Sequence, residues 1–88
     1  MKIILSPRAV KALKKLPKID QIAVAAKIRL LKEDTVLLNE EKLSGFKDIF
    51  RVRIGNYRIV YRKSKSFIYV ILIGHRKDIY ELLKRLVE

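Results

Sequence analysis

The stretch F-R-V-R-I-G-N-Y-R-I-V-Y, residues 50–61, decides the fold because it predicts a two-stranded antiparallel hairpin. Apolar residues and arginines alternate on both sides of Gly55 and Asn56. A glycine at the first central position is what a type II′ turn requires, since that position needs a positive φ. If these two residues alone make the turn, Arg53 lies opposite Arg58. The turn thereby sets the register of both strands.

The predicted hairpin has one apolar face and one arginine face, because successive side chains of a strand point to opposite sides. The apolar face carries Phe50, Val52, Ile54, Tyr57, Ile59 and Tyr61. The arginine face carries Arg51, Arg53, Arg58 and, one step further out, Arg62.

The arginine face is unusual because like charges directly opposite each other destabilise a strand pair by about 0.2–1 kcal/mol. Arg53 and Arg58 therefore predict an anion between them, and the planar guanidinium group suits a phosphate. This favours a nucleic-acid-binding surface. The alternative is that these arginines pair with acidic residues or extend into water.

Length and charge restrict the class of protein. With 88 residues, the chain has room for one small core, so we expect a single domain over residues 1–88. The 21 Lys and Arg against nine Asp and Glu give a net charge of +12. This charge predicts a polyanionic partner, such as nucleic acid or an acidic protein. Because basic residues occur along the whole chain, no membrane partner is expected.

Cysteine and histidine usage excludes further classes. The chain has no cysteine, so it can form neither a disulfide nor a thiolate metal site, and a reducing cytoplasm is the expected location. His75 is the single histidine, so a zinc site is not expected, and neither is any cofactor. No apolar run reaches the ~18 residues of a membrane span, and the N-terminus does not resemble a signal peptide.

The N-terminal half predicts a strand over residues 2–5 followed by two helices. Ser6 and Pro7 are typical of a helix start, and the first helix is expected over residues 8–16. The second helix, capped by Asp20, is expected to end near residue 33 and to form an antiparallel hairpin with the first. It is apolar on more than half of its circumference, which suits a helix that lies on a sheet and touches a helical neighbour.

The C-terminal half predicts the rest of an α+β fold. Residues 34–45 are expected to form a connecting loop, and residues 62–66 a polar turn. Residues 67–73 are apolar on both faces and predict the most buried strand. A final helix is expected over residues 78–87. The predicted fold is a small antiparallel sheet with an N-terminal helical hairpin on one face, a C-terminal helix, and the arginine face left open to solvent.

Three stretches resemble the RelE/ParE toxin superfamily, and its RelE branch in particular: residues 43–46 (LSGF), residues 50–61 and residues 73–80 (IGHRKDIY). The similarity covers the whole chain in length, element order and basic charge. It implies a RelE-like fold and a toxin of a type II toxin–antitoxin system. RelE-type toxins are mRNA interferases that cut mRNA in the ribosomal A site and inhibit translation. They use no metal: the 2′-hydroxyl attacks the adjacent phosphate and leaves a 2′,3′-cyclic phosphate and a 5′-hydroxyl.

The resemblance also implies partners. The first is a small, acidic, RelB-like antitoxin. The toxin itself would contact ribosomal RNA and mRNA. The toxin–antitoxin complex is expected to bind its own operator DNA through the antitoxin.

Family active sites use basic residues of the central strands and a tyrosine in the C-terminal segment. On this chain the matching positions are Arg51, Arg53, Arg58, Arg76 and Tyr80. Some relatives carry lysines where Arg51 and Arg53 stand. An arginine stays protonated, so phosphate stabilisation carries over to these two positions and a general-base role does not.

The general base is therefore sought elsewhere, and both Tyr80 and His75 are candidates, since histidine titrates near neutrality. Counting strand alternation from Ile71, expected opposite Arg58, predicts His75 on the arginine face and Arg76 on the other face. The family motif nevertheless assigns Arg76 to the site.

Two further basic residues, Arg62 and Lys77, are expected to contact RNA. Each proposed site residue also has a plain structural interpretation. His75 could bond to backbone at a strand end, and Tyr80 could cover the core from an amphipathic helix.

Two other functions stay open. A ParE-type toxin shares the fold but inhibits gyrase by protein–protein contact and needs no catalytic residues. A non-catalytic RNA- or ribosome-binding module would use the arginine face without cleaving RNA.

Overall fold

The secondary structure follows the predicted order with one added strand. The computed structural model describes residues 2–33, 40–75 and 79–87. Its elements are β1 (Lys2–Leu5), α1 (Pro7–Lys15), α2 (Lys18–Leu31), β2 (Glu41–Lys42), β3 (Ile49–Ile54), β4 (Tyr57–Lys63), β5 (Phe67–Gly74) and α3 (Ile79–Val87). The short β2 lies where a loop was expected. The α+β class is confirmed.

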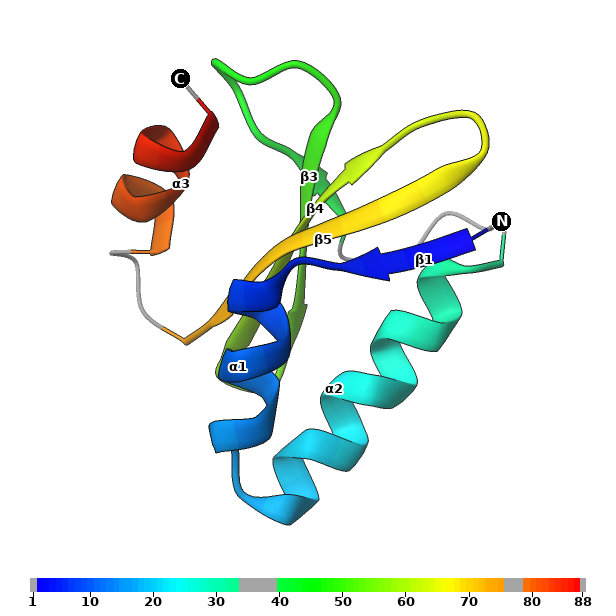
Figure 1. Ribbon diagram of the computed structural model, residues 1–88, viewed down its shortest axis with the longest axis vertical. Helices are drawn as coiled ribbons and strands as arrows, with labels where there is room; N and C mark the ends of the chain where they lie inside the picture. The colour runs from blue at the N-terminus through cyan, green and yellow to red at the C-terminus, as the bar shows by residue number, and fades with distance from the viewer. Residues whose placement is uncertain (1, 34–39, 76–78, 88) are drawn as a thin grey trace.

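The strands form one five-stranded sheet in the order β1-β5-β4-β3-β2 (Figure 1). β1 pairs with β5 in parallel, and the other neighbours are antiparallel. The sheet is therefore mixed and not purely antiparallel as predicted. The difference arises at β1, an edge strand that runs parallel to β5.

The register of the β3–β4 hairpin is as predicted. Arg53 lies opposite Arg58, and Phe50 lies opposite Tyr61. Gly55 has a φ of +58°, the left-handed conformation that a glycine adopts at little energetic cost. The two-residue turn thus aligns all arginines of the hairpin on one face.

The predicted register of β4 and β5 is wrong. Arg58 lies opposite Gly74 and not opposite Ile71. The Ser64 hydroxyl donates to the Phe67 carbonyl at 3.0 Å and accepts from the Phe67 N–H at 3.1 Å, which moves the turn toward β5. A β-bulge in β5, where Ile71 is the extra residue opposite Val60 and Tyr61, shifts the register by one further residue.

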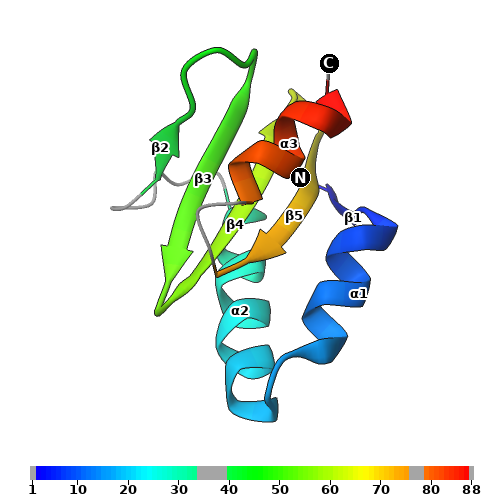
Figure 2. The same cartoon turned by 90° about the vertical axis from the view of Figure 1, so that its left-hand side faces the viewer.

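α1 and α2 cover the apolar face of the hairpin (Figures 1 and 2). The Ser6 side chain caps α1 as predicted, because its Oγ accepts from the Ala9 N–H at 3.0 Å. The predicted Asp20 cap is wrong: α2 begins at Lys18, after Pro17, and Asp20 lies in the first turn. The core on this side consists of Ala9, Val24, Ile28, Leu31, Val52, Ile59, Tyr61, Ile68, Val70 and Ile73.

The second face of the sheet is not open, which corrects the prediction. α3 packs on it through Ile79 and Leu83, which bury Ile49 and Val60 (Figure 2). Gly74 lies close to α3: an added Cβ there would lie 3.1 Å from the Ile79 Cδ1, so the Ile79 side chain would have to shift slightly. α3 thus covers one part of the arginine face and leaves a cleft beside it.

Candidate active site

A cleft of about 400 Å³ lies between α3, the arginine face of β3 and β4, and the segment between β2 and β3. We call it the arginine cleft. Its lining residues are Glu41, Leu43, Ser44, Phe46, Arg51, Arg53, Arg58, Tyr80 and Lys84. Three predicted arginines and the predicted tyrosine therefore line one cavity, although the arginines belong to β3 and β4 and the tyrosine to α3.

Two of the arginines that line the cleft each carry a buried polar atom without a partner. Among the described residues, two buried side-chain nitrogen or oxygen atoms lack a hydrogen-bond partner, namely Nε of Arg51 and Nε of Arg58. Buried polar groups are nearly always paired in folded proteins. Both orphan donors belong to arginines that line the same cleft, so two cationic guanidinium groups come together there.

Arg51 is partly neutralised by an acidic residue, as the alternative interpretation of the arginine face expected. Its Nη2 forms an ion pair with Oε2 of Glu41, which lies opposite it on β2. The Arg51 side chain is 12% exposed and that of Glu41 63%. One edge of the cleft is therefore closed by a carboxylate that water can reach.

Arg53 and Arg58 face each other at the other end of the cleft, beside the hairpin turn. They also line an adjoining hollow of about 260 Å³ with Gly55, Asn56 and His75. Arg58 Nη1 donates to the His75 backbone carbonyl at 3.4 Å. The backbone at the end of β5 thus contacts the Arg58 guanidinium group.

His75 does not lie on the arginine face, because the bulge in β5 reverses the predicted alternation. Its ring packs against the Tyr57 ring at a centroid distance of 5.6 Å. Tyr57 belongs to the face that α1 and α2 cover. His75 nevertheless lines the hollow beside Arg53 and Arg58, so the end of the strand brings it near the two arginines from the other side.

α3 contributes Tyr80 and Lys84, which are four residues apart and so project from the same side of the helix. Tyr80 is half-buried and Lys84 is exposed. The sequence reasoning found Tyr80 through the family motif and missed Lys84. Lys84 follows Tyr80 by four residues, a spacing that is visible in the sequence and predicts that both lie on the same side of a helix.

Arg62 lies away from the arginine cleft. It is exposed and lines another cavity, of about 740 Å³, with Arg8, Lys11 and Tyr69 among its walls. The structure therefore separates Arg62 from the other arginines of the hairpin. Arg76 and Lys77, assigned to the site by motif, lie outside the described residues.

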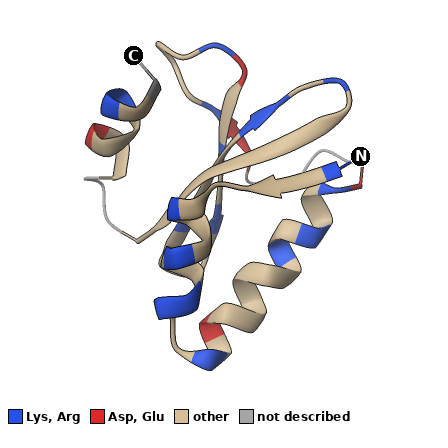
Figure 3. Ribbon diagram, in the orientation of Figure 1, with Lys and Arg blue, Asp and Glu red and all other residues tan. Residues whose placement is uncertain are grey.

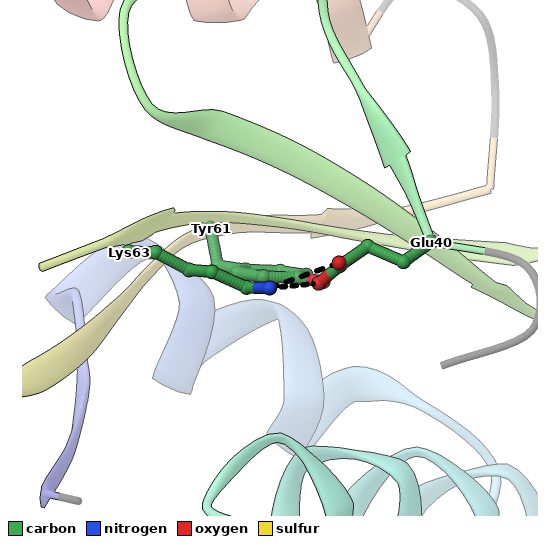
Figure 4. Close-up of polar contacts among 3 residues, drawn as sticks. All are labelled: Glu40, Tyr61 and Lys63. Carbon is green, nitrogen blue, oxygen red and sulfur yellow. Dashed lines mark hydrogen bonds and ion pairs between the residues drawn. The ribbon is translucent and has the colours of Figure 1, made fainter. Parts of the chain in front are cut away.

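Glu40, the residue before Glu41, belongs to a polar network on the opposite face of the sheet (Figure 4). The Tyr61 hydroxyl donates to Glu40 Oε1, and Lys63 Nζ donates to Glu40 Oε2 at 2.9 Å. Burial, followed by the hydrogen bond to Glu40, raises the pKa of Tyr61. Glu40 and Glu41 therefore neutralise one cation on each face of the sheet.

Tyr57 makes a similar bond to α2. Its hydroxyl donates to Asp20 Oδ2 at 3.0 Å. That hydrogen bond raises the pKa of Tyr57. The bond ties the hairpin turn, and with it Arg58, to the first turn of α2.

Lysines and arginines occur on all three helices (Figure 3). Within the described ranges, no group of three His, Asp or Glu residues could hold a metal ion. The described helices include none with the length and apolarity needed to cross a membrane.

The family model of the ParE toxin of the type II toxin–antitoxin system parDE matches residues 3–80. The chain belongs to this family. It is thus a type II toxin of the RelE/ParE superfamily, as the resemblance implied. No protein of curated function matches the ParE-family chain by sequence.

Solved structures similar to this ParE-family toxin include RelE proteins. The toxin of the RelB–RelE antitoxin–toxin complex from Methanococcus jannaschii is 27% identical, with a TM-score of 0.73. The match covers 89% of this chain and 95% of that one. The isolated E. coli RelE toxin is 26% identical with a TM-score of 0.69, and 98% of each chain is covered. The YoeB/ParE toxin from Agrobacterium tumefaciens is 21% identical, with a TM-score of 0.73, 86% of this chain covered and 99% of that one, and supports the fold alone.

Proposed function

We propose that this toxin is a RelE-type endoribonuclease that cuts mRNA in the A site of translating ribosomes in the cytoplasm. The observation that carries the proposal is the pair of buried, unpartnered guanidinium Nε atoms of Arg51 and Arg58 in one cleft. A scissile phosphate in the cleft supplies acceptors for the guanidinium groups of both residues. Phe46 also lines the cleft, and an aromatic ring beside a basic groove gives an RNA base a surface on which to stack.

In this mechanism the arginines stabilise charge and Tyr80 transfers protons. The RNA 2′-oxygen loses its proton and forms a bond to the adjacent phosphorus. The bond from phosphorus to the 5′-oxygen breaks, and that oxygen takes up a proton. Arg51, Arg53 and Arg58 stabilise the additional negative charge on the phosphoryl oxygens during this step.

Tyr80 is the preferred acid–base group because it lines the arginine cleft, whereas His75 lines the adjoining hollow. A proton-transfer group must come within hydrogen-bond reach of the reacting oxygen. His75, which lies beside Arg53 and Arg58, is therefore the second candidate for the acid–base group. Arg76 and Lys77 are proposed as further contacts to the RNA on the basis of the motif.

A ParE-type action on gyrase is the second candidate, and the family model that matches the chain favours it. Such an action needs protein contact and leaves the arginines of the cleft without a chemical task. The proposed partner under either function is a small acidic antitoxin, since two of the similar solved structures are RelB–RelE complexes from Methanococcus jannaschii and Pyrococcus horikoshii. We propose that the antitoxin, and not the toxin, contacts operator DNA.

The deciding experiment is primer extension on a translated message, with wild type, Arg58→Ala and Tyr80→Phe. We expect new 3′ ends in the A site with wild type and a strong loss with both variants. A gyrase supercoiling assay runs in parallel. Inhibited gyrase with an intact message would refute the endoribonuclease. RNA binding that weakens in Arg58→Ala, with no cleavage product at any concentration, would indicate a non-catalytic binding module.

A further inference from the structure

α2 has a second apolar side that the fold does not use. Its sheet-facing side is formed by Val24, Ile28 and Leu31, which are buried in the core. The opposite side carries an apolar stripe of exposed residues at helical spacing. We call it the outer stripe of α2, and it consists of Ile19, Ile22, Ala23, Ala26 and Leu30.

The exposure of this stripe is large for apolar side chains. Ile19 is 79% exposed, Ile22 59% and Leu30 42%. The sequence predicted that the broad apolar surface of α2 would be used by its helical neighbour. α1 instead lies beside α2 (Figure 1), and the stripe stays exposed. A helix that is apolar on both sides is normally covered on both sides, and a contiguous exposed apolar patch marks an interaction site.

The shape of the stripe fits a helix. Ala23 and Ala26 lie at its centre, between Ile19 and Ile22 toward one end and Leu30 at the other. Small residues at the centre let a second helix approach closely, while the larger side chains pack into its grooves. An amphipathic helix that lays its apolar side on this stripe would use the i, i+3, i+4 and i+7 spacing common to such contacts.

The charges beside the stripe indicate the chemistry of the partner. Lys18, Arg29 and Lys32 are exposed along one side of α2. Asp20, a nearby carboxylate, accepts a hydrogen bond from Tyr57. Two copies of a chain with a net charge of +12 repel each other, so a second copy is disfavoured. A helix with acidic residues beside its apolar side is complementary to this surface.

We infer that the outer stripe of α2 is the docking site for an amphipathic, acidic helix of a protein partner. The stripe lies on the side of the sheet opposite α3 and the arginine cleft (Figure 2). A partner held here leaves the cleft accessible. The same partner therefore needs a second segment to block the cleft. The segment that anchors the partner on α2 and the segment that inhibits the toxin are then different.

The test uses the full chain and two synthetic 18-residue peptides of about −6 charge, a length that spans the whole of α2. One places leucines and isoleucines on a single side of a helix, with glutamates beside them. The other has the same composition in shuffled order, so that generic electrostatic attraction stays equal. Binding is measured by calorimetry and mapped by amide chemical shifts. We expect the amphipathic peptide to bind at least tenfold more tightly, with shifts centred on α2 and no loss of RNA binding.

Variants make the assignment specific. Ile19→Ser with Ile22→Ser should weaken the amphipathic peptide at least tenfold, with the thermal midpoint of unfolding unchanged. Leu86→Ser, an exposed leucine of α3, is the matched control and should bind as wild type. Equal affinity for both peptides, unchanged affinity of the double variant, or shifts in the cleft would overturn the inference. So would a dimer in light scattering that the double variant dissolves, since the occupant would then be a second copy. These readouts involve no cleavage and stay valid if the proposed nuclease activity fails.

Discussion

Glu41 forms an ion pair with Arg51, its opposite residue in the register of β2 and β3, at the edge of the arginine cleft. The Glu41 carboxylate is 63% exposed, so water reaches the pair from that side, whereas the Arg51 side chain is largely buried. An RNA phosphate that binds Arg51 has to displace the carboxylate. Because Glu41 is the exposed partner of the pair, the proposed function assigns it as the group that an RNA phosphate displaces.

Replacing Glu41 with Gln should therefore strengthen RNA binding. We expect a several-fold tighter complex and a salt slope that increases by about 0.7, as for one additional phosphate contact with single-stranded RNA. Fluorescence anisotropy with a short RNA at several salt concentrations measures both. Glu33→Gln changes the net charge equally on an exposed residue at the end of α2. An equal gain in both variants would mean that only overall charge matters.

Replacing Arg58 with Ala should remove most cleavage. One preorganised charge-stabilising donor typically accounts for a factor of about 10²–10³ in rate, and Arg58 carries one of the two unpartnered Nε atoms. Cleavage rates on ribosomes and circular dichroism of the variant measure activity and folding. Arg62→Ala is the matched control, because Arg62 belongs to the same strand and lines another cavity. A comparable loss of cleavage rate in both variants would exclude a special role for the cleft.

Replacing Lys84 with Ala should weaken RNA binding, and Arg85→Ala should do so less. Lys84 lines the arginine cleft, whereas the next residue, Arg85, lines a different cavity beside Arg8 and His75. Both changes remove one positive charge from α3, so long-range attraction falls equally. The affinity ratio of the two variants, measured by anisotropy at fixed salt, isolates the local contact. A ratio near one would show that Lys84 does not touch the RNA.

Replacing Tyr80 with Phe tests the acid–base group without removing the ring. We expect cleavage to fall by a factor of about 10²–10⁴, the usual contribution of a positioned proton-transfer group, with unchanged RNA affinity. His75→Gln should reduce cleavage much less. Single-turnover rates between pH 6 and 9 compare the two variants. If His75→Gln causes the larger loss and flattens the pH profile, the histidine is the acid–base group.

The hairpin could be predicted in detail from the sequence because a two-residue turn with glycine leaves one register. The next pair of strands could not, since the Ser64 hydroxyl bonds and the bulge in β5 involve side-chain geometry that alternation does not encode. One such inserted residue reverses the predicted face of every residue after it. That is how His75 came to be assigned to the arginine face.

The sequence predicts one wall of the arginine cleft but not the other. The arginines follow from the hairpin, but a cleft needs a second wall, and α3 supplies it. The sequence contained a sign of that cover, because Ile49 and Val60 are apolar residues on the arginine face and both are buried. Lys84 and Phe46 join the site only after α3 and the segment before β3 are in place.

Replacing Tyr61 with Phe should lower stability and reduce its loss in alkali. Tyr61 is fully buried and donates to Glu40, and a hydrogen bond to a charged group contributes about 1.5–3 kcal/mol. The raised pKa of Tyr61 means that the unfolded chain releases the phenolic proton first. Its contribution is complete below pH ~10 and falls by about 1.4 kcal/mol per pH unit above it. Urea unfolding at pH 7 and 11 measures how far the free energy of unfolding falls between the two pH values, and this fall should be smaller in Tyr61→Phe than in wild type. In Tyr57→Phe, a variant near the surface, the fall should differ less from that of wild type. An equal alkaline drop in wild type and Tyr61→Phe would mean that lysine deprotonation dominates and that the Tyr61–Glu40 bond contributes little.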